Sequence, residues 1–257
     1  MALIHWLITH LTPLFIVASP ILSYGDQINS MHKSRSSAGF SLDIPLIMLT
    51  ASILKIFYWF GARFDLALLL QAILMIIVQV VLLHVALTHR PNATISHKPF
   101  EGILPEYQPF PRPYDFWQWR PHRPYWQFIA VFSATLLVLQ LVLGTYAVYT
   151  DVLGYLGLAI EAVLPLPQIM ANHRRRSCKG FRISVLITWL LGDASKLSYF
   201  FLSSGSAVPL AFRMCGLFQA GCDCFLGVQY WMYGDGEVRR DGILSPVLER
   251  EMEFVKT

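Results

Sequence analysis

Charged residues are scarce in this sequence: Asp, Glu, Lys and Arg make up 14% of the 257 residues, whereas apolar residues make up 55%. Soluble domains carry about 25% charged residues, so the composition excludes an ordinary soluble fold. Cysteine is scarce as well. The four cysteines give no disulfide framework, and the spacing of Cys222 and Cys224 suits no standard zinc motif. We therefore expect neither a disulfide scaffold nor a metal site.

Catalytic signatures are also missing from the sequence. It contains no phosphate-binding glycine loop, no zinc-protease histidine pair and no nucleophile elbow. Nothing in it argues for an enzyme. We accordingly expect no catalytic residue, no cofactor and no nucleic-acid partner.

Long apolar runs are what the sequence does contain. Each is about 20 residues long, the length that crosses about 30 Å of hydrocarbon. We identify seven such runs, at 7–29, 42–61, 65–88, 126–149, 152–171, 182–203 and 208–233. Sixteen of the 20 Lys and Arg residues lie in alternate connections and in the C-terminal tail, which the positive-inside rule places in the cytosol. The sequence therefore predicts an all-α, multi-pass membrane protein with a lumenal N-terminus and a cytosolic C-terminus.

Residues 27–60 and 168–201 are two copies of one segment, aligned without a gap at an offset of 141. Eleven of the 34 aligned positions are identical, and Lys55 and Lys196 are one such pair. A direct repeat in a membrane protein indicates one unit used twice in the same orientation. Two three-helix units of the same orientation need one further span between them. We therefore predict a 3+1+3 arrangement of seven helices.

The predicted organisation has five parts. They are a first three-helix repeat (1–88), a cytosolic loop rich in Pro and aromatic residues (89–125), a linker helix (126–149), a second repeat (150–233) and a cytosolic tail (234–257). Aromatic residues interspersed with Arg in the loop are typical of a segment at the level of lipid headgroups, with a simple tether as the alternative.

Five ionisable residues lie inside predicted spans: Lys55, Glu161, Asp193, Lys196 and Asp223. Charges within a membrane are costly and usually functional, so we expect these residues to line a polar pathway; a structural network is the alternative. Asp193 and Lys196 are three residues apart and should face one side of their helix. Lys55 has Ser52 at the place of that aspartate, so it needs another partner, for which Glu161 and Asp223 are candidates.

The first predicted helix of each repeat ends at a glutamine: Gln27 in the first copy and Gln168 in the second. Pro165 and Pro167 precede Gln168, and a proline within a span kinks the helix. We expect a bend at this point. Gating and purely structural roles for Gln27, Pro167 and Gln168 both remain open.

These glutamines, each followed by a basic turn that ends in Gly-Phe (39–40 and 180–181), resemble the motif of the PQ-loop family of seven-helix membrane proteins. The family includes exporters of cystine and of cationic amino acids and is related to the SWEET sugar transporters. The stretches "ILKIFYWFGARFDLALLLQAILMI", "FWQW" and "GDASKLSYF" are similar to the branch of solute carrier family 66 member 2 and its fungal counterparts. The first copy departs from the motif, with Asp26 in place of the proline.

The resemblance implies a phospholipid scramblase of Golgi and endosomal membranes, which needs no energy input and opposes lipid flippases. Two alternatives stay open. One is a proton-coupled or facilitative transporter of a small solute such as an amino acid. The other is a scaffold that recruits trafficking partners through its loop and tail. A scramblase predicts a polar cleft open to lipid, whereas a transporter predicts a cavity closed off from lipid.

Overall fold

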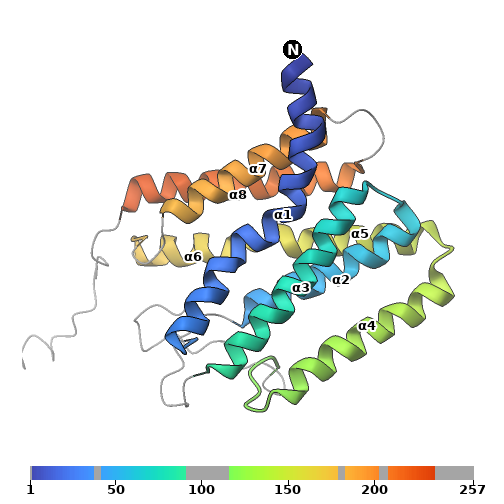
Figure 1. Ribbon diagram of the computed structural model, residues 1–257, viewed down its shortest axis with the longest axis horizontal. Coiled ribbons are helices and arrows are strands. Elements are labelled where there is room, and N and C mark those ends of the chain that lie inside the picture. Colours follow the sequence, from blue (N-terminus) through green and yellow to red (C-terminus); the bar gives the residue numbers. More distant parts are fainter. Residues whose placement is uncertain (1, 38–41, 91–115, 179–182, 203–207, 235–257) are drawn as a thin grey trace, which may run out of the picture.

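The computed structural model describes residues 2–37, 42–90, 116–178, 183–202 and 208–234, and every regular element in these ranges is a helix (Figure 1). The helices are α1 (Ala2–Ser34), α2 (Asp43–Ala62), α3 (Leu66–Thr88), α4 (Arg123–Leu143), α5 (Ala147–Ala162), α6 (Leu166–Arg175), α7 (Ile183–Leu202) and α8 (Leu210–Tyr233). Three of them, α2, α3 and α4, are by length and composition able to cross a membrane. The chain is thus a multi-pass membrane protein.

The predicted span 152–171 is wrong as a single helix, because a turn at 163–165 divides it into α5 and α6. The prolines explain the break. Pro165 is the N-cap of α6, and Pro167 follows in its first turn, where the missing N–H costs nothing. Proline has no backbone N–H. Neither proline can therefore donate the hydrogen bond that would continue the helix upstream, and α5 ends at Ala162. In the first copy α1 runs unbroken past Asp26 and Gln27.

The linker helix also differs from its predicted bounds of 126–149. It ends at Leu143, and Gly144 and Tyr146 form the connection to α5. Helix α4 packs against α2 and lies at the edge of the bundle (Figure 1). Its only buried side chains are Tyr125 and Leu136, among the residues of α4 that the structure describes. This peripheral position fits a helix that connects two larger units.

The other helices pack in a pattern that repeats. Helix α3 lies against α1 and α2, and α8 lies against α5, α6 and α7. Between these two groups, α1 contacts α7 and α2 contacts α5. In chain order the first group is α1, α2 and α3, and the second is α5 with α6, then α7, then α8. The first helix of each group therefore contacts the second helix of the other group.

The turns after α1 and α6 repeat in atomic detail. Arg35 and Arg176, aligned in the sequence repeat, both have left-handed backbone angles, with φ of 48° and 50°. Two residues further on, the N–H of Ser37 donates to the carbonyl of His89 at 3.0 Å, and the N–H of Cys178 donates to that of Gly234 at 3.0 Å. These acceptors are the C-caps of α3 and α8. We call the end of the bundle with these two bonds the turn end.

The aromatic segment before α4 packs against α2 and α3. The side chains of Trp117 and Tyr125 are 1% and 0% exposed and pack with Leu49, Leu83 and Leu87 of α2 and α3. The indole of Trp117 donates to the carbonyl of Leu42 at 2.6 Å. These two side chains therefore form a small core with α2 and α3, and the position of the segment at the level of the headgroups stays a prediction. Tyr114 and Arg112 lie outside the described residues.

Glycines bring α2 and α5 into close contact. A side-chain carbon at Gly154 would overlap the ring of Tyr58, and one at Gly61 would overlap Thr150. The Tyr58 ring cannot retreat easily, because Phe64 and Phe212 lie against it at centroid distances of 5.2 and 6.2 Å. Small residues of this kind let helices approach closely within a membrane.

We expect Gly154→Val to lower the free energy of unfolding by about 1–3 kcal/mol, the usual cost of overpacking. Gly221→Val is the matched control, since no atom of another helix lies within 4 Å of a side-chain carbon built at Gly221 on α8. Thermal unfolding of the two detergent-solubilised variants measures the difference. Equal unfolding temperatures would show that the α2–α5 contact adapts to a larger residue.

Candidate functional site

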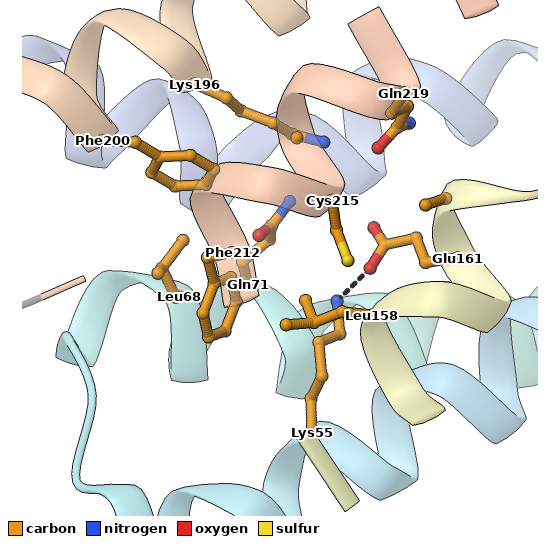
Figure 2. Close-up of a pocket in the computed structure, with 12 residues that line it drawn as sticks. Lys55, Leu68, Gln71, Leu158, Glu161, Lys196, Phe200, Phe212, Cys215 and Gln219 are labelled. Carbon is orange, nitrogen blue, oxygen red and sulfur yellow. Dashed lines mark hydrogen bonds and ion pairs between the residues drawn. The ribbon is translucent and has the colours of Figure 1, made fainter. Parts of the chain in front are cut away.

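A cavity of about 30 Å³ lies among α2, α3, α5, α7 and α8 (Figure 2). Its polar lining residues come from these five helices: Lys55, Gln71, Glu161, Lys196 and Gln219, together with Cys215. Phe200, Phe212 and Leu68 supply apolar wall. A space of this size holds about two water molecules, so in this conformation it holds neither an amino acid nor a lipid headgroup.

Lys55 and Glu161 form an ion pair at one side of the cavity. The Lys55 ammonium donates to Glu161 Oε2 at 2.5 Å, and the two side chains are 5% and 12% exposed. The pair joins α2 to α5, next to the glycine contact described above. Of the two partners expected for Lys55, the structure brings Glu161 to it. Burying two charges is costly, and only their close contact compensates for the loss of water.

Lys196 lies across the cavity from this pair, beside Gln219 (Figure 2). It is half-buried and makes no ion pair with any residue that the structure describes. The repeat thus places its two lysines on the wall of one cavity, but in different states. Lys55 is neutralised by a carboxylate in contact, whereas the charge of Lys196 faces the cavity without such a partner.

Asp193 and Asp223 lie behind the cavity and do not line it. They are 6% and 2% exposed, and their carboxyl groups are in hydrogen-bonding contact with each other, with Lys196 close enough to attract both. Each keeps one oxygen without a hydrogen-bond partner among the described residues. The expected close Asp193–Lys196 pair is therefore replaced by contact between two carboxyl groups. Such groups repel one another unless a proton or a cation lies between them.

The two glutamines of the repeat differ in their surroundings. Gln27 is exposed on α1, whereas Gln168 is half-buried on α6 and donates to Asn172 Oδ1 at 2.7 Å. Pro167 takes the second position of α6; its side chain lies outside the described residues, as do the Gly-Phe pairs. A break in the helix therefore exists in one copy only, where α5 ends one residue after Glu161.

Two buried amides are not among the site residues that the sequence predicts. Asn172 and Gln229 are 2% and 1% exposed, and Gln229 Nε2 donates to the carbonyl of Ile169 at 3.0 Å, linking α8 to α6. Their signal is weak in the sequence, because a single amide in an apolar helix is usually an ordinary interhelical bond. Only their burial, and the bond from Gln229 to α6, distinguishes them.

Comparisons with known proteins agree with this architecture. The family profile described as "PQ loop repeat" matches residues 149–208, which contain the α5–α6 break, Asp193 and Lys196. The chain is also similar to the protein named "Scramblase ANY1" of Saccharomyces cerevisiae, with 28% identity over 277 aligned positions that cover 84% of this chain and 68% of the yeast protein. No solved structure matches. The repeat and this relative together support the PQ-loop family for this protein, with a fungal scramblase among its relatives.

Proposed function

We propose that this protein is a phospholipid scramblase of Golgi and endosomal membranes, which moves lipids between leaflets without energy input and opposes the flippases. The observation that carries the proposal is the charged cavity inside an apolar helix bundle, in a chain similar to a protein named as a scramblase. Buried ionisable residues in a membrane are costly and are usually kept for a polar substrate. Phospholipid headgroups are such substrates.

We further propose that the seven spans form two units in the 3+1+3 arrangement, with α5 and α6 together making the fifth span. The repeated packing supports this layout, because α1 against α7 and α5 against α2 are equivalent contacts. The first repeat (1–88) and second repeat (150–233) then meet around the cavity. The distribution of Lys and Arg supports an orientation with the turn end, the loop 89–125 and the tail 234–257 in the cytosol and the N-terminus in the lumen.

In this mechanism the headgroup phosphate competes with Glu161 for Lys55. The cavity is too small for a headgroup, so passage requires α2 and α5 to separate, and the Lys55–Glu161 bond is what closes them. Lys196 offers the phosphate a second cation. The Asp193–Asp223 pair lies behind the cavity and attracts an ammonium group by its negative charge, while the acyl chains stay in the bilayer. Zwitterionic lipids fit this order of charges.

Reconstitution tests the proposal directly. Liposomes with a fluorescent phospholipid in both leaflets are treated with dithionite, which bleaches the outer leaflet only. We expect vesicles that contain the protein to lose well over half of their fluorescence, because lipids from the inner leaflet reach the outer one. Bleaching that stops near one half, with the protein folded and inserted, would contradict a scramblase under these conditions.

One observation favours a transporter of a small solute as the second candidate. The cavity is small and is walled by Phe200 and Phe212, which suits an enclosed site that opens to one side at a time. Uptake of amino acids into the same liposomes, with and without a pH gradient, tests this function. The scaffold alternative predicts that neutralising Lys55, Asp193 and Lys196 leaves the cellular function intact.

A further inference from the structure

The repeat relates the ion pair of α2 and α5 to two positions on α7 and α1. Extended along the helix that precedes the aligned segment, the offset of 141 matches Pro20 to Glu161, as it matches Lys55 to Lys196. The contact of α1 with α7 is likewise the counterpart of the contact of α5 with α2. Pro20 is buried, with less than 2% of its surface exposed. A proline therefore occupies the place from which the other copy supplies a carboxylate to its lysine.

Neighbouring residues agree with this correspondence. One turn before Glu161, Gly157 faces Lys55, since a side-chain carbon at Gly157 would lie 3.5 Å from Lys55 Cγ. The counterpart of Gly157 on α1 is Ile16. Ile16 is 0% exposed and belongs to the same core cluster as Tyr199 of α7. The α1 positions that correspond to the α2-facing side of α5 are thus buried in the core that α1 shares with α7.

Hydrogen bonds connect this part of α1 to the cavity. Pro20 has no N–H, so the carbonyl of Ile16 lacks its helical partner, and the hydroxyl of Ser19 donates to this carbonyl at 2.8 Å. Ser19 in turn accepts a hydrogen bond from Gln71 Nε2 at 3.3 Å. Gln71 lines the cavity together with Lys196. Position 20 therefore follows directly after a residue that is bonded to the cavity wall.

Lys196 has opposite charge near it but not in contact. Asp193 and Asp223 attract its ammonium group from behind the cavity, and neither forms an ion pair with it. Helix α1 does not supply the missing carboxylate, because its one acidic residue is Asp26, which is exposed. Within an apolar bundle little water competes for an ammonium group, so a charged hydrogen bond to an oxyanion is strong there.

We propose that Lys196 is an oxyanion-binding subsite, in which the substrate supplies the negative charge that position 20 lacks. The oxyanion lies between Lys196 and the wall of α1 at Pro20, with the side-chain amide of Gln219 as a neighbouring donor. It binds there first, because no ion pair has to break, whereas Lys55 is reached only after Glu161 is displaced. That the oxyanion is a phospholipid phosphate rests on the proposed function; the carboxylate of a free amino acid offers the same chemistry.

A carboxylate at position 20 tests the subsite without any substrate. Pro20→Glu supplies this carboxylate, and Pro20→Gln is the matched control, since it removes the same proline and adds a side chain of the same shape without the charge. We expect Pro20→Glu to unfold about 2–4 °C above Pro20→Gln, and the difference to disappear when Lys196→Met is added to both. Equal unfolding temperatures, or a difference that persists without Lys196, would overturn the proposal.

Cross-linking tests the same geometry if Pro20→Glu does not fold. In a variant with the four native cysteines replaced by alanine, Pro20→Cys/Lys196→Cys is treated with a short bifunctional methanethiosulfonate in membranes. Glu161→Cys/Lys55→Cys, which places cysteines at the corresponding positions of the ion pair, is the positive control. We expect a bridge in both double variants. A bridge in the control without one between positions 20 and 196 would show that α1 does not face Lys196, and the proposal would fail.

Transport assays identify the oxyanion. With Lys196 occupied by the carboxylate at position 20, lipid movement is expected to be about tenfold slower in Pro20→Glu than in Pro20→Gln. If the wild type moves no lipid and the uptake of amino acids slows instead, the oxyanion is a solute carboxylate; the proposed function is then wrong and the subsite stands. If the wild type scrambles and the two variants scramble equally fast, the subsite is wrong and the function stands.

Discussion

Replacing Glu161 by leucine is expected to lower the free energy of unfolding by about 3–5 kcal/mol, because it leaves the buried Lys55 charge without a partner. The ammonium group is almost fully enclosed, and within the described residues Glu161 is the carboxylate bonded to it. Lys55→Met should cost a similar amount, since Glu161 would then be the unpaired charge. Thermal or denaturant unfolding of the solubilised protein measures both effects.

The double variant Lys55→Met/Glu161→Leu separates the structural role of the pair from its functional role. Replacing a buried ion pair by apolar residues of similar size is often neutral for stability. We therefore expect the double variant to unfold near the wild-type temperature but to scramble poorly, since its cavity lacks the Lys55 charge. A stable double variant with full activity would show that the pair only holds α2 to α5.

Lys196→Met is expected to reduce the rate of lipid movement about 10- to 100-fold, with little change in stability. Lys196 faces the cavity and makes no ion pair within the described part of the chain. Its replacement therefore breaks no ion pair and leaves no carboxylate that was bonded to the lost ammonium group. A hydrogen bond to a charged group contributes about 1.5–3 kcal/mol, which sets the expected loss. The dithionite assay measures the rate, and unfolding measures the stability.

Lys33→Met is the matched control for this prediction. Lys33 is an exposed lysine at the end of α1, away from the cavity, and its loss removes the same charge from the chain. Equal reductions in the two variants would mean that Lys196 acts only through net charge at the membrane. A large loss of stability in Lys196→Met would mean that it supports the bundle by neutralising Asp193 and Asp223.

The helical class and the positions of α2 and α3 could be predicted from the sequence, because runs of apolar residues and the repeat report directly on membrane helices. The break between α5 and α6 was predicted only as a bend. Two prolines separated by one residue remove two donors within a single turn, so the helix ends and restarts instead of curving.

In the candidate site, the residues could be predicted from the sequence but their partners could not. Lys55, Glu161 and Lys196 could be selected because charge inside a membrane is rare. Which carboxylate meets which lysine depends on how α2, α5, α7 and α8 approach one another, and no local pattern contains that information. Asp193 illustrates this point: three residues of spacing suggested Lys196 as its partner, whereas packing of α7 against α8 places Asp223 in contact.

The bonds at the turn end are made by main-chain atoms, and this has a consequence for how the two copies can diverge. Position 37 is Ser and position 178 is Cys, yet the same N–H reaches the carbonyl at the end of the third helix in both. Any residue except proline supplies that N–H. Mutation can therefore alter the exposed side chains of the two turns, at positions 35 and 176, independently, while both turns keep the attachment of the first helix to the third.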